Sequence, residues 1–287
     1  MRRNRLADAC ALVVFLALAA ILLRSGEFSE HSWLNHDVAN SLYVAVRLLR
    51  GDVLYVDWAY YVMPSIVFLS AGAARVSGLL GLSPHSGIHL ALLASGLLGT
   101  LALRRSSREA DPVAWVVRLA YLAVLVSAGL LPSDFAQREH FFVLLFVPYF
   151  FWRASGARAS GLVCTLLFSL AFVCMIKPHF VAAVALTELC WLDRSRDRLR
   201  VWASFLTGAL LPFALLALHS QAALEAFFAR AVSYQMGDSY DAYQASLSLF
   251  LSSSALRFRG RAHFSRYSPE RSATVSAWRS ARRFSTC

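Results

Sequence analysis

The segment HDVANSLYVAVRLLRGDVLYVDWAYYVMP, residues 36–64, lies shortly after the first long apolar run of the chain. Its first half has apolar side chains at three- and four-residue intervals: Val38, Leu42, Ala45, Val46 and Leu49. This period predicts an amphipathic helix that begins near Asp37, and Gly51 is suited to end it. A helix with one apolar face needs an apolar surface to pack on.

The second half of the segment is acidic and aromatic. Asp52 begins a turn, and Asp57 follows it. Four aromatic side chains lie around these acids: Tyr55, Trp58, Tyr60 and Tyr61. Tyrosine and tryptophan gather at the membrane–water interface, because their rings combine an apolar body with a polar edge. We therefore expect the whole segment to lie against a membrane surface.

The composition of the chain supports a membrane protein. Of the 287 residues, 58% are hydrophobic and only 16% are charged, and the mean hydropathy is +0.53. In soluble domains about a quarter of the residues are charged. We predict an all-α, polytopic integral membrane protein, because a helix satisfies its own backbone hydrogen bonds within lipid.

Charge and cysteine content argue against several other classes. Eight arginines and one glutamate follow Ser252, so this tail carries +7 of the net charge of +11. The total charge is therefore no sign of nucleic-acid binding, and we expect no nucleic-acid partner. The five cysteines form no CxxC pair and have no histidine at metal-site spacing: Cys10, Cys164, Cys174, Cys190 and Cys287. This pattern argues against a disulfide framework and against a zinc site.

The N-terminus predicts the orientation of the chain. Arg2, Arg3 and Arg5 precede the apolar run Leu6–Leu23. A cleaved signal peptide is one interpretation, but the run continues beyond the small-residue motif at 17–19, which favours a retained first span. Because basic residues favour the cytoplasmic side, we place the N-terminus in the cytoplasm and a first loop, residues 24–87, on the outer side.

The run Val62–Leu82 is long enough to cross a membrane, but the basic residues after it argue against a crossing. If it crossed, Ile88–Leu103 would return outward and carry three arginines with it: Arg104, Arg105 and Arg108. That arrangement violates the positive-inside rule. We therefore expect Val62–Leu82 to be an outer juxtamembrane helix and Ile88–Leu103 to be the second span.

Five further runs complete a prediction of about seven transmembrane helices: Val113–Leu131, Phe141–Trp152, Gly161–Met175, Phe180–Leu192 and Val201–Leu218. Phe141–Trp152 and Phe180–Leu192 are short against the roughly 20 residues that a bilayer needs, so either could be half of a broken helix. In this topology the segment from Pro132 to His140 is an outer loop. Arg153 falls in an inner loop, and Glu188 lies near the inner end of its span, where we expect it to reach water.

Residues 253–287 differ from the rest of the chain. They contain eight serines and eight arginines and show no apolar period. This composition predicts a disordered basic tail. A second hypothesis is a frameshifted read-through, because the hydrophobic runs stop abruptly. We therefore divide the chain into a transmembrane region, residues 1–252, and an Arg/Ser-rich tail, residues 253–287.

The order of these features resembles that of a known enzyme superfamily. A first span with its N-terminus inside is followed by an outer loop with the early acid Asp37, the amphipathic helix, the motif G-D-x-x-Y-x-D at 51–57 and an aromatic-Pro segment. This order is similar to that of the GT-C glycosyltransferases, which include protein O-mannosyltransferases and the aminoarabinose transferase of lipid A. The similarity covers roughly residues 1–220, about the front half of such an enzyme, so we expect only its N-terminal part here.

The resemblance implies a function and a location. Enzymes of this superfamily move a sugar from a polyprenyl phosphate to an acceptor at the outer face of the membrane. For this chain it implies a polyprenyl-phosphate-linked sugar as donor and a lipid or cell-envelope glycan as acceptor. It also implies contact with membrane lipids and residence in a bacterial inner membrane.

The resemblance also assigns site residues. It places the catalytic first-loop acid on Asp37, a second acidic position on Asp134 or Glu139, and the lysine at the outer end of a later span on Lys177. The superfamily often has Asp-Glu at the first position, whereas this chain has Asp37 followed by Val38. Because of that departure, the sequence does not define a set of ligands for a divalent metal, and metal binding stays an open alternative. The resemblance implies no other cofactor.

The residues support a similar site independently. Sugar transfer needs a carboxylate to take the proton of the acceptor hydroxyl and cations to hold the departing phosphate. Asp37 fits the first role, and Arg138 and Lys177 fit the second, since both fall at outer ends of spans. We add Asp57, Glu139 and His140 to the predicted substrate-binding residues.

Structural interpretations of these residues remain open. Asp37 or Asn35 can cap the amphipathic helix, and Asp52 and Asp57 suit turns. The sequence Arg138-Glu139-His140 can be an ion pair at a helix end. The sequence Lys177-Pro178-His179 can be a helix break with a lysine reaching for water.

Two alternatives to an active enzyme also remain. One is a non-enzymatic polytopic protein, such as a transporter or a flippase subunit. A protein of that kind should show polar residues that face each other within the membrane and an internal repeat, and the sequence shows neither. The other is a truncated, inactive glycosyltransferase fragment.

Overall fold

The structure is a computed structural model that describes residues 12–21, 36–57, 62–106, 118, 120–123, 137–191 and 197–232. These residues belong to the first of two compact units, Met1–Gly237, and the second unit, Asp238–Cys287, lies outside them. The predicted boundary at residue 252 and the basic tail therefore fall outside the described residues. Within them every regular element is helical, which confirms the all-α prediction.

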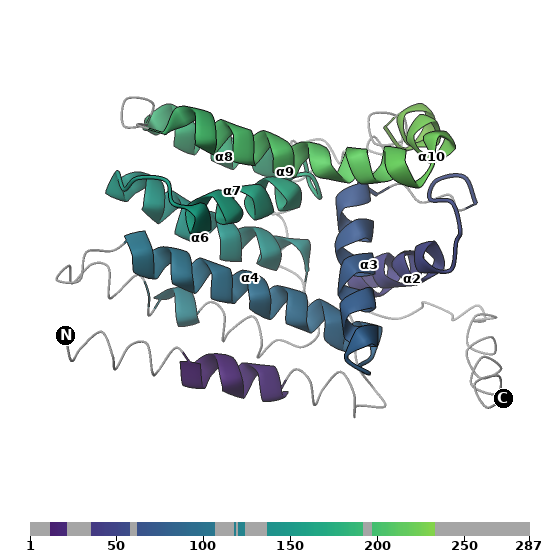
Figure 1. Cartoon of the computed structure of the whole chain (residues 1–287), viewed down its shortest axis with the longest axis horizontal. Helices are drawn as coiled ribbons and strands as arrows, with labels where there is room; N and C mark the ends of the chain where they lie inside the picture. Colours follow the sequence, from purple (N-terminus) through teal and green to yellow (C-terminus); the bar gives the residue numbers. More distant parts are fainter. Residues whose placement is uncertain are drawn as a thin grey trace, which may run out of the picture. The chain divides into compact units, whose positions relative to one another are not determined.

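The labelled elements are α2 (His36–Leu49), α3 (Pro64–Leu79), α4 (Pro84–Ser106), α6 (Arg138–Ser155), α7 (Gly161–Cys174), α8 (Phe180–Cys190), α9 (Arg198–His219), α10 (Gln221–Ala226) and the π-helix η2 (Phe227–Val232). A further helix spans Leu12–Ile21. Figure 1 shows α4, α6, α7 and α9 running alongside one another as a bundle. The helix α3 lies across one end of this bundle, next to α2.

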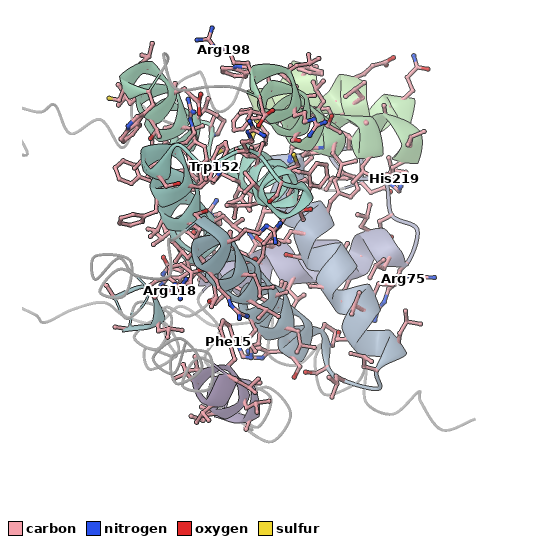
Figure 2. All side chains as sticks on the ribbon, turned by 60° about the vertical axis from the view of Figure 1, so that its left-hand side comes forward. Phe15, Arg75, Arg118, Trp152, Arg198 and His219 are labelled. Atoms are coloured by element: carbon pink, nitrogen blue, oxygen red, sulfur yellow. The ribbon has the colours of Figure 1, made fainter. Side chains whose placement is uncertain are left out.

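The position of α3 suits the predicted juxtamembrane helix. It packs on α2 and α4 and also contacts α7 and α9. Its Arg75 is exposed and projects away from the neighbouring helices (Figure 2). If the bundle crosses a membrane, a helix that lies across its end can keep such a charge in water. A charge in the middle of a membrane span would instead be costly.

The two ends of the bundle differ in charge. At the α3 end, His219 Nε2 lies 3.3 Å from the carbonyl oxygen of Asp52. At the opposite end, the backbone N–H of Ala159 donates to the Asp197 carboxylate at 3.0 Å. Most arginines of the described helices and turns lie toward this second end: Arg104, Arg105, Arg118, Arg153, Arg158, Arg198 and Arg200. Figure 2 marks Arg198 and His219 at the two ends of α9.

Two helices are long and apolar enough to cross a membrane, α4 with 23 residues and α9 with 22. The helices α3, α7, α8 and Leu12–Ile21 are apolar but shorter. The helix α6 has 18 residues, because its first turn includes Arg138, Glu139 and His140. The prediction that these three residues end an outer loop was therefore wrong.

The helix α2 confirms the predicted helix but not all of the predicted face. Its buried residues are Val38, Ser41, Leu42, Val44 and Ala45. The predicted core residue Leu49 is 42% exposed. The helix ends before Gly51, whose φ of 102° places it in the left-handed region that glycine adopts without strain.

The sequence suggested that Tyr55 lies at an open interface, but the structure buries it. It is 3% exposed, its ring lies 5.2 Å from that of Phe227, and its hydroxyl donates to the carbonyl oxygen of Val62 at 2.6 Å. It therefore fastens the segment after α2 to the end of the bundle. Trp58, Tyr60 and Tyr61 lie outside the described residues.

At the end opposite α3, two expectations were wrong. Arg153 belongs to the last turn of α6 and is 4% exposed, so it is not in a loop. Glu188 belongs to the last turn of α8 and is 9% exposed, so it does not reach water. A charged group in apolar surroundings needs a partner, and these two side chains pair with each other.

Close approach of helices builds the core. The most extensive contact is between α7 and α9. A Cβ added to Gly208 of α9 would lie 2.1 Å from the carbonyl oxygen of Phe168 in α7. Small residues at such crossings let helix backbones meet, as they do in membrane proteins.

We predict that Gly208→Ala lowers the free energy of unfolding by about 1–3 kcal/mol, because the added methyl group forces α7 and α9 apart. The thermal unfolding midpoint of the protein in detergent should fall accordingly. The matched control is Gly72→Ala in α3, where nothing lies within 4 Å of the added Cβ. That change should stabilise the protein by about 0.5–1 kcal/mol. Equal midpoints for the two variants would contradict this account of the α7–α9 crossing.

Candidate functional site

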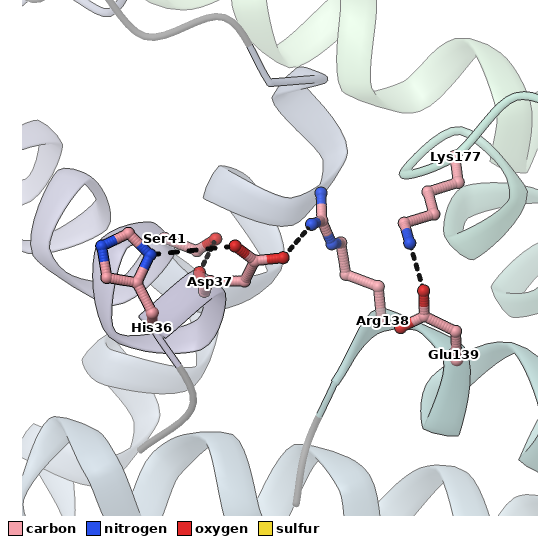
Figure 3. Close-up of polar contacts among 6 residues, drawn as sticks. All are labelled: His36, Asp37, Ser41, Arg138, Glu139 and Lys177. Carbon is pink, nitrogen blue, oxygen red and sulfur yellow. Dashed lines mark hydrogen bonds and ion pairs between the residues drawn. The ribbon is translucent and has the colours of Figure 1, made fainter. Parts of the chain in front are cut away.

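An ion pair joins the beginnings of α2 and α6. Asp37 is the second residue of α2, and Arg138 is the first residue of α6. Arg138 Nη2 donates to Asp37 Oδ2, although the two residues are 101 positions apart in the sequence (Figure 3). The Arg138 side chain is 20% exposed and that of Asp37 is 58% exposed. The pair is thus open to solvent on the Asp37 side.

A second ion pair lies beside the first. Lys177 Nζ donates to Glu139 Oε1, which brings the turn between α7 and α8 to the start of α6 (Figure 3). The Lys177 carbonyl oxygen accepts from the backbone N–H of Phe180 at 2.9 Å. Lys177 is therefore attached to the first turn of α8, and its position follows that of α8.

These four side chains border one cavity of about 120 Å³. Its lining residues come from the first two turns of α2, α3, α4 and α6, from the N-cap of α6 and from the α7–α8 turn: Asp37, Val38, Ser41, Ile66, Ser70, Ile88, Gln137, Arg138, Glu139, Phe141 and Lys177. The charged side chains and Gln137 form one part of the wall, and the aliphatic and aromatic side chains form another. The cavity lies at the α3 end of the bundle.

The charged groups of the cavity wall are balanced, and helix N-termini lie among them. Its two carboxylates and two cations balance in formal charge. The N-terminal parts of α2, α3, α4 and α6 contribute to the lining, and a helix N-terminus carries a partial positive charge. Gln137 at the N-cap of α6 makes no side-chain capping hydrogen bond to the first backbone N–H groups.

Two serine hydroxyls belong to the cavity wall. Ser41 donates to the backbone carbonyl oxygen of Asp37 at 2.8 Å. Ser70 is 1% exposed, and its hydroxyl has no hydrogen-bond partner among the residues that the structure describes. A buried polar atom without a partner costs free energy, so a ligand that reaches Ser70 gains by bonding to it.

The pKa of Glu139 results from opposing effects. Partial burial raises it, but the hydrogen bonds from Lys177 and from its own backbone N–H, and the charges of Lys177 and Arg138, lower it. The net result is a pKa below the ordinary value of 4.5. Glu139 is therefore ionised at neutral pH and neutralises Lys177.

The structure brings together four of the six predicted site residues: Asp37, Arg138, Glu139 and Lys177. Asp57 is not in the lining. Its carboxylate accepts from the backbone N–H of Val53 at 2.7 Å, which is the turn role left open by the sequence. His140 lies in the first turn of α6 but does not line the cavity. Asp134 lies outside the described residues.

Sequence reasoning missed Ser70, Ser41 and Gln137. A serine within an apolar helix carries no signal of its own, because it often bonds to its own backbone. For the metal left open above, no three His, Cys, Asp or Glu side chains of the described residues gather into a site.

Comparison of the chain with protein-family models, with curated proteins and with solved structures finds no match. The GT-C resemblance therefore remains a resemblance in the order of sequence features. Any function assigned to the chain has to be argued from the cavity and its side chains.

We predict that acid weakens the fold partly through Glu139. A carboxylate with a lowered folded-state pKa stabilises the fold at and above its unfolded-state pKa, and this contribution is lost as the pH falls through the folded-state value. Between neutral pH and a pH well below 4.5, the wild type should therefore lose more stability than Glu139→Gln. The difference should be less than about 1 kcal/mol, because the Glu139 side chain is 44% exposed.

Thermal unfolding in detergent across this pH range measures the effect. Glu225→Gln, at an exposed position in α10, is the control and should follow the wild type. If Glu139→Gln and the wild type lost stability in parallel, the Lys177–Glu139 pair would not contribute to the fold.

Proposed function

We propose that this chain is a GT-C-type membrane glycosyltransferase that moves a sugar from a polyprenyl phosphate to a lipid or cell-envelope glycan acceptor. One observation carries the proposal. An acid and two cations, selected from the sequence for the roles of base and phosphate ligands, lie on the wall of one cavity. They come from α2, α6 and the α7–α8 turn.

The proposed topology has about seven spans and a cavity on the outer face, with an N-terminus in the cytoplasm of a bacterial inner membrane. The distribution of charge supports it, because the arginine-rich end of the bundle is opposite the cavity and basic residues favour the cytoplasmic side. The helix α3, which lies across the cavity end, is then the outer juxtamembrane helix.

The proposed donor site uses Arg138 and Lys177. Each of these cations pairs with a carboxylate. A phosphate that enters must exchange places with these carboxylates, and charge-assisted hydrogen bonds from a guanidinium and an ammonium reward the exchange. The positive ends of nearby helices add to the attraction.

The proposed base is Asp37. Its carboxylate lies on the cavity wall, where it accepts from Arg138. A donor phosphate that binds Arg138 takes over its guanidinium, so the Asp37 carboxylate can turn to the acceptor hydroxyl. In the transfer step the acceptor oxygen bonds to the anomeric carbon, the bond from that carbon to the phosphate oxygen breaks, and Asp37 takes the acceptor proton. The phosphate leaves on the lipid, held by the cations.

The structure also contains one feature of the non-enzymatic alternative. Arg153 and Glu188 form an ion pair between two apolar helices, as ionisable residues do in transporters. They lie in the last turns of α6 and α8, at the end of the bundle away from the cavity. A transporter or flippase subunit would bind the lipid phosphate without releasing sugar, which separates it from the enzyme.

We predict that Asp37→Asn lowers release of polyprenyl phosphate from a polyprenyl-phosphate sugar by about a hundredfold or more, the usual scale for loss of a general base. Asn keeps the size of Asp but takes no proton at neutral pH, and as an N-cap it is nearly equal to Asp. Binding of polyprenyl phosphate and expression should persist.

The control is Asp57→Asn, since the Asp57 carboxylate bonds to the backbone of a turn outside the cavity. Its transfer rate should stay within a few-fold of the wild-type rate. Transfer by Asp37→Asn at the wild-type rate would remove Asp37 from the reaction. Binding of polyprenyl phosphate without sugar release, in the wild type, would favour the flippase or the inactive fragment.

A second prediction tests the topology. On a cysteine-free background, Leu80→Cys should react with a membrane-impermeant thiol reagent in intact cells, because Leu80 follows α3 at the cavity end and is 61% exposed. Ser106→Cys, at the opposite end of α4, should react only after the cells are permeabilised. Reaction at position 106 in intact cells would mean that Val62–Leu82 crosses the membrane.

A further inference from the structure

Three polar side chains form a cluster between the last turns of α6 and α8. Arg153 Nη2 donates to Glu188 Oε2 at 2.8 Å and to the carbonyl oxygen of Trp191 at 3.1 Å. Arg153 Nε lies 2.7 Å from Glu188 Oε1, as an ion-pair contact without hydrogen-bond geometry. Tyr149 donates its hydroxyl to the same Oε1 at 2.5 Å. The mechanism proposed above uses none of these groups.

The cluster is buried, so its geometry is restrictive. Tyr149 is 0% exposed, Arg153 is 4% exposed and Glu188 is 9% exposed. Within apolar surroundings a charge that loses its counter-charge is strongly disfavoured. The last turns of α6 and α8 are therefore held at the one relative depth and rotation that lets both Glu188 oxygens meet Arg153 and Tyr149.

At the other end, the turn before α8 meets the start of α6 through the Lys177–Glu139 pair. Both helices run from the cavity end toward the cluster. In the pair at the cavity α6 contributes the acid, whereas in the cluster it contributes the cation. Along α6 these two residues are about 21 Å apart, at about 1.5 Å per residue. Two aromatic contacts lie between α6 and the segment containing α8, with ring centroids 4.2 Å apart for Phe142–Phe180 and 5.1 Å apart for Phe150–Trp191.

The apolar contacts of α8 are few, so its position depends more strongly on the polar cluster. Its buried residues are Phe180, Val184, Thr187 and Glu188, a single narrow stripe. On its other side Leu186 is 63% exposed and Leu189 is 62% exposed. A short helix held by one stripe can rotate or slide, unless a directional contact prevents it.

We propose that Arg153, Glu188 and Tyr149 are positioning residues that hold α8 against α6 and so keep Lys177 beside Glu139 at the cavity. Lys177 lies in the turn just before α8, and its carbonyl oxygen accepts from the backbone N–H of Phe180, the first residue of α8, so a rotation or shift of this helix moves Lys177 with it. The catalytic use of Lys177 depends on the proposed function, whereas its placement by the cluster does not.

The chain offers a direct probe of this placement, because Lys177 is its only lysine. Acylation by an amine-reactive ester, followed by peptide mass spectrometry, separates Lys177 from the N-terminal amine. The experiment uses the full chain in detergent micelles at neutral pH and needs no substrate. Lys177 is paired and 28% exposed, so it should react slowly in the wild type.

Glu188→Gln removes the negative charge of the cluster, leaves Arg153 without its counter-charge and keeps the size of the side chain. We expect Lys177 to be acylated several-fold faster in this variant, while helix content by circular dichroism stays unchanged. Glu139→Gln removes the partner of Lys177 itself and sets the upper limit of the rate. Glu225→Gln, the same change on the exposed surface of α10, should leave the rate unchanged.

The double variant Arg153→Glu with Glu188→Arg restores the ion pair in reverse, and it should return the acylation rate toward that of the wild type. If Glu188→Gln does not fold, Tyr149→Phe replaces it, because this change removes only the hydrogen bond from the tyrosine hydroxyl to Glu188. Acylation of Lys177 at the wild-type rate in the folded variant would overturn the proposal. A reversed pair that does not slow acylation would also overturn it, since the effect would then come from general loosening of the two helices.

Discussion

The structure depends on the rule that a charged side chain among apolar helices must meet its counter-charge inside the protein. The helix α6 shows this most clearly. Its Arg138 reaches Asp37 of α2, its Glu139 receives Lys177, and its Arg153 meets Glu188 of α8. These partners come from three different parts of the chain, so the ion pairs join α6 to α2, to the α7–α8 turn and to α8.

The same rule explains why the cavity forms where it does. First turns of helices collect at one end of the bundle, and their positive partial charges face the space between them. Acids are stabilised at such ends, and Asp37 and Glu139 both lie in first turns. The cations Arg138 and Lys177 then balance these acids. The resulting wall is neutral in total and holds groups of both signs, which is what the proposed transfer reaction requires.

The sequence predicted the all-helical class well because a membrane environment, inferred from the composition, would leave few choices. A chain with so many apolar residues can satisfy its backbone within a membrane only as helices or a closed barrel, and its apolar runs have helical length. The end of α2 before Gly51 and the break between α7 and α8 around Pro178 were visible for a similar reason, since glycine and proline act locally on the backbone. The site residues stood out because an ionisable group beside an apolar helix is a candidate for function, and the resemblance marked some of the same positions.

The predictions that failed were ones that depended on the partner of a side chain. Tyr55 was expected at an interface, and Glu188 in water, because each lies near the end of an apolar segment. The structure buries both, one against Phe227 and the other against Arg153 and Tyr149. The hydroxyl of Ser70 gave no signal at all until α3 was seen on the cavity wall.

By itself, therefore, the sequence determined the helical class, most helix positions and a short set of candidate acids and cations, since these follow from composition and local backbone chemistry. The tertiary structure alone decided which acid meets which cation, which charges are buried and where the cavity lies. Those outcomes depend on contacts between residues far apart in the chain, such as Asp37 and Arg138 at a separation of 101. No local pattern encodes such a contact, because its free energy exists only once the helices have packed.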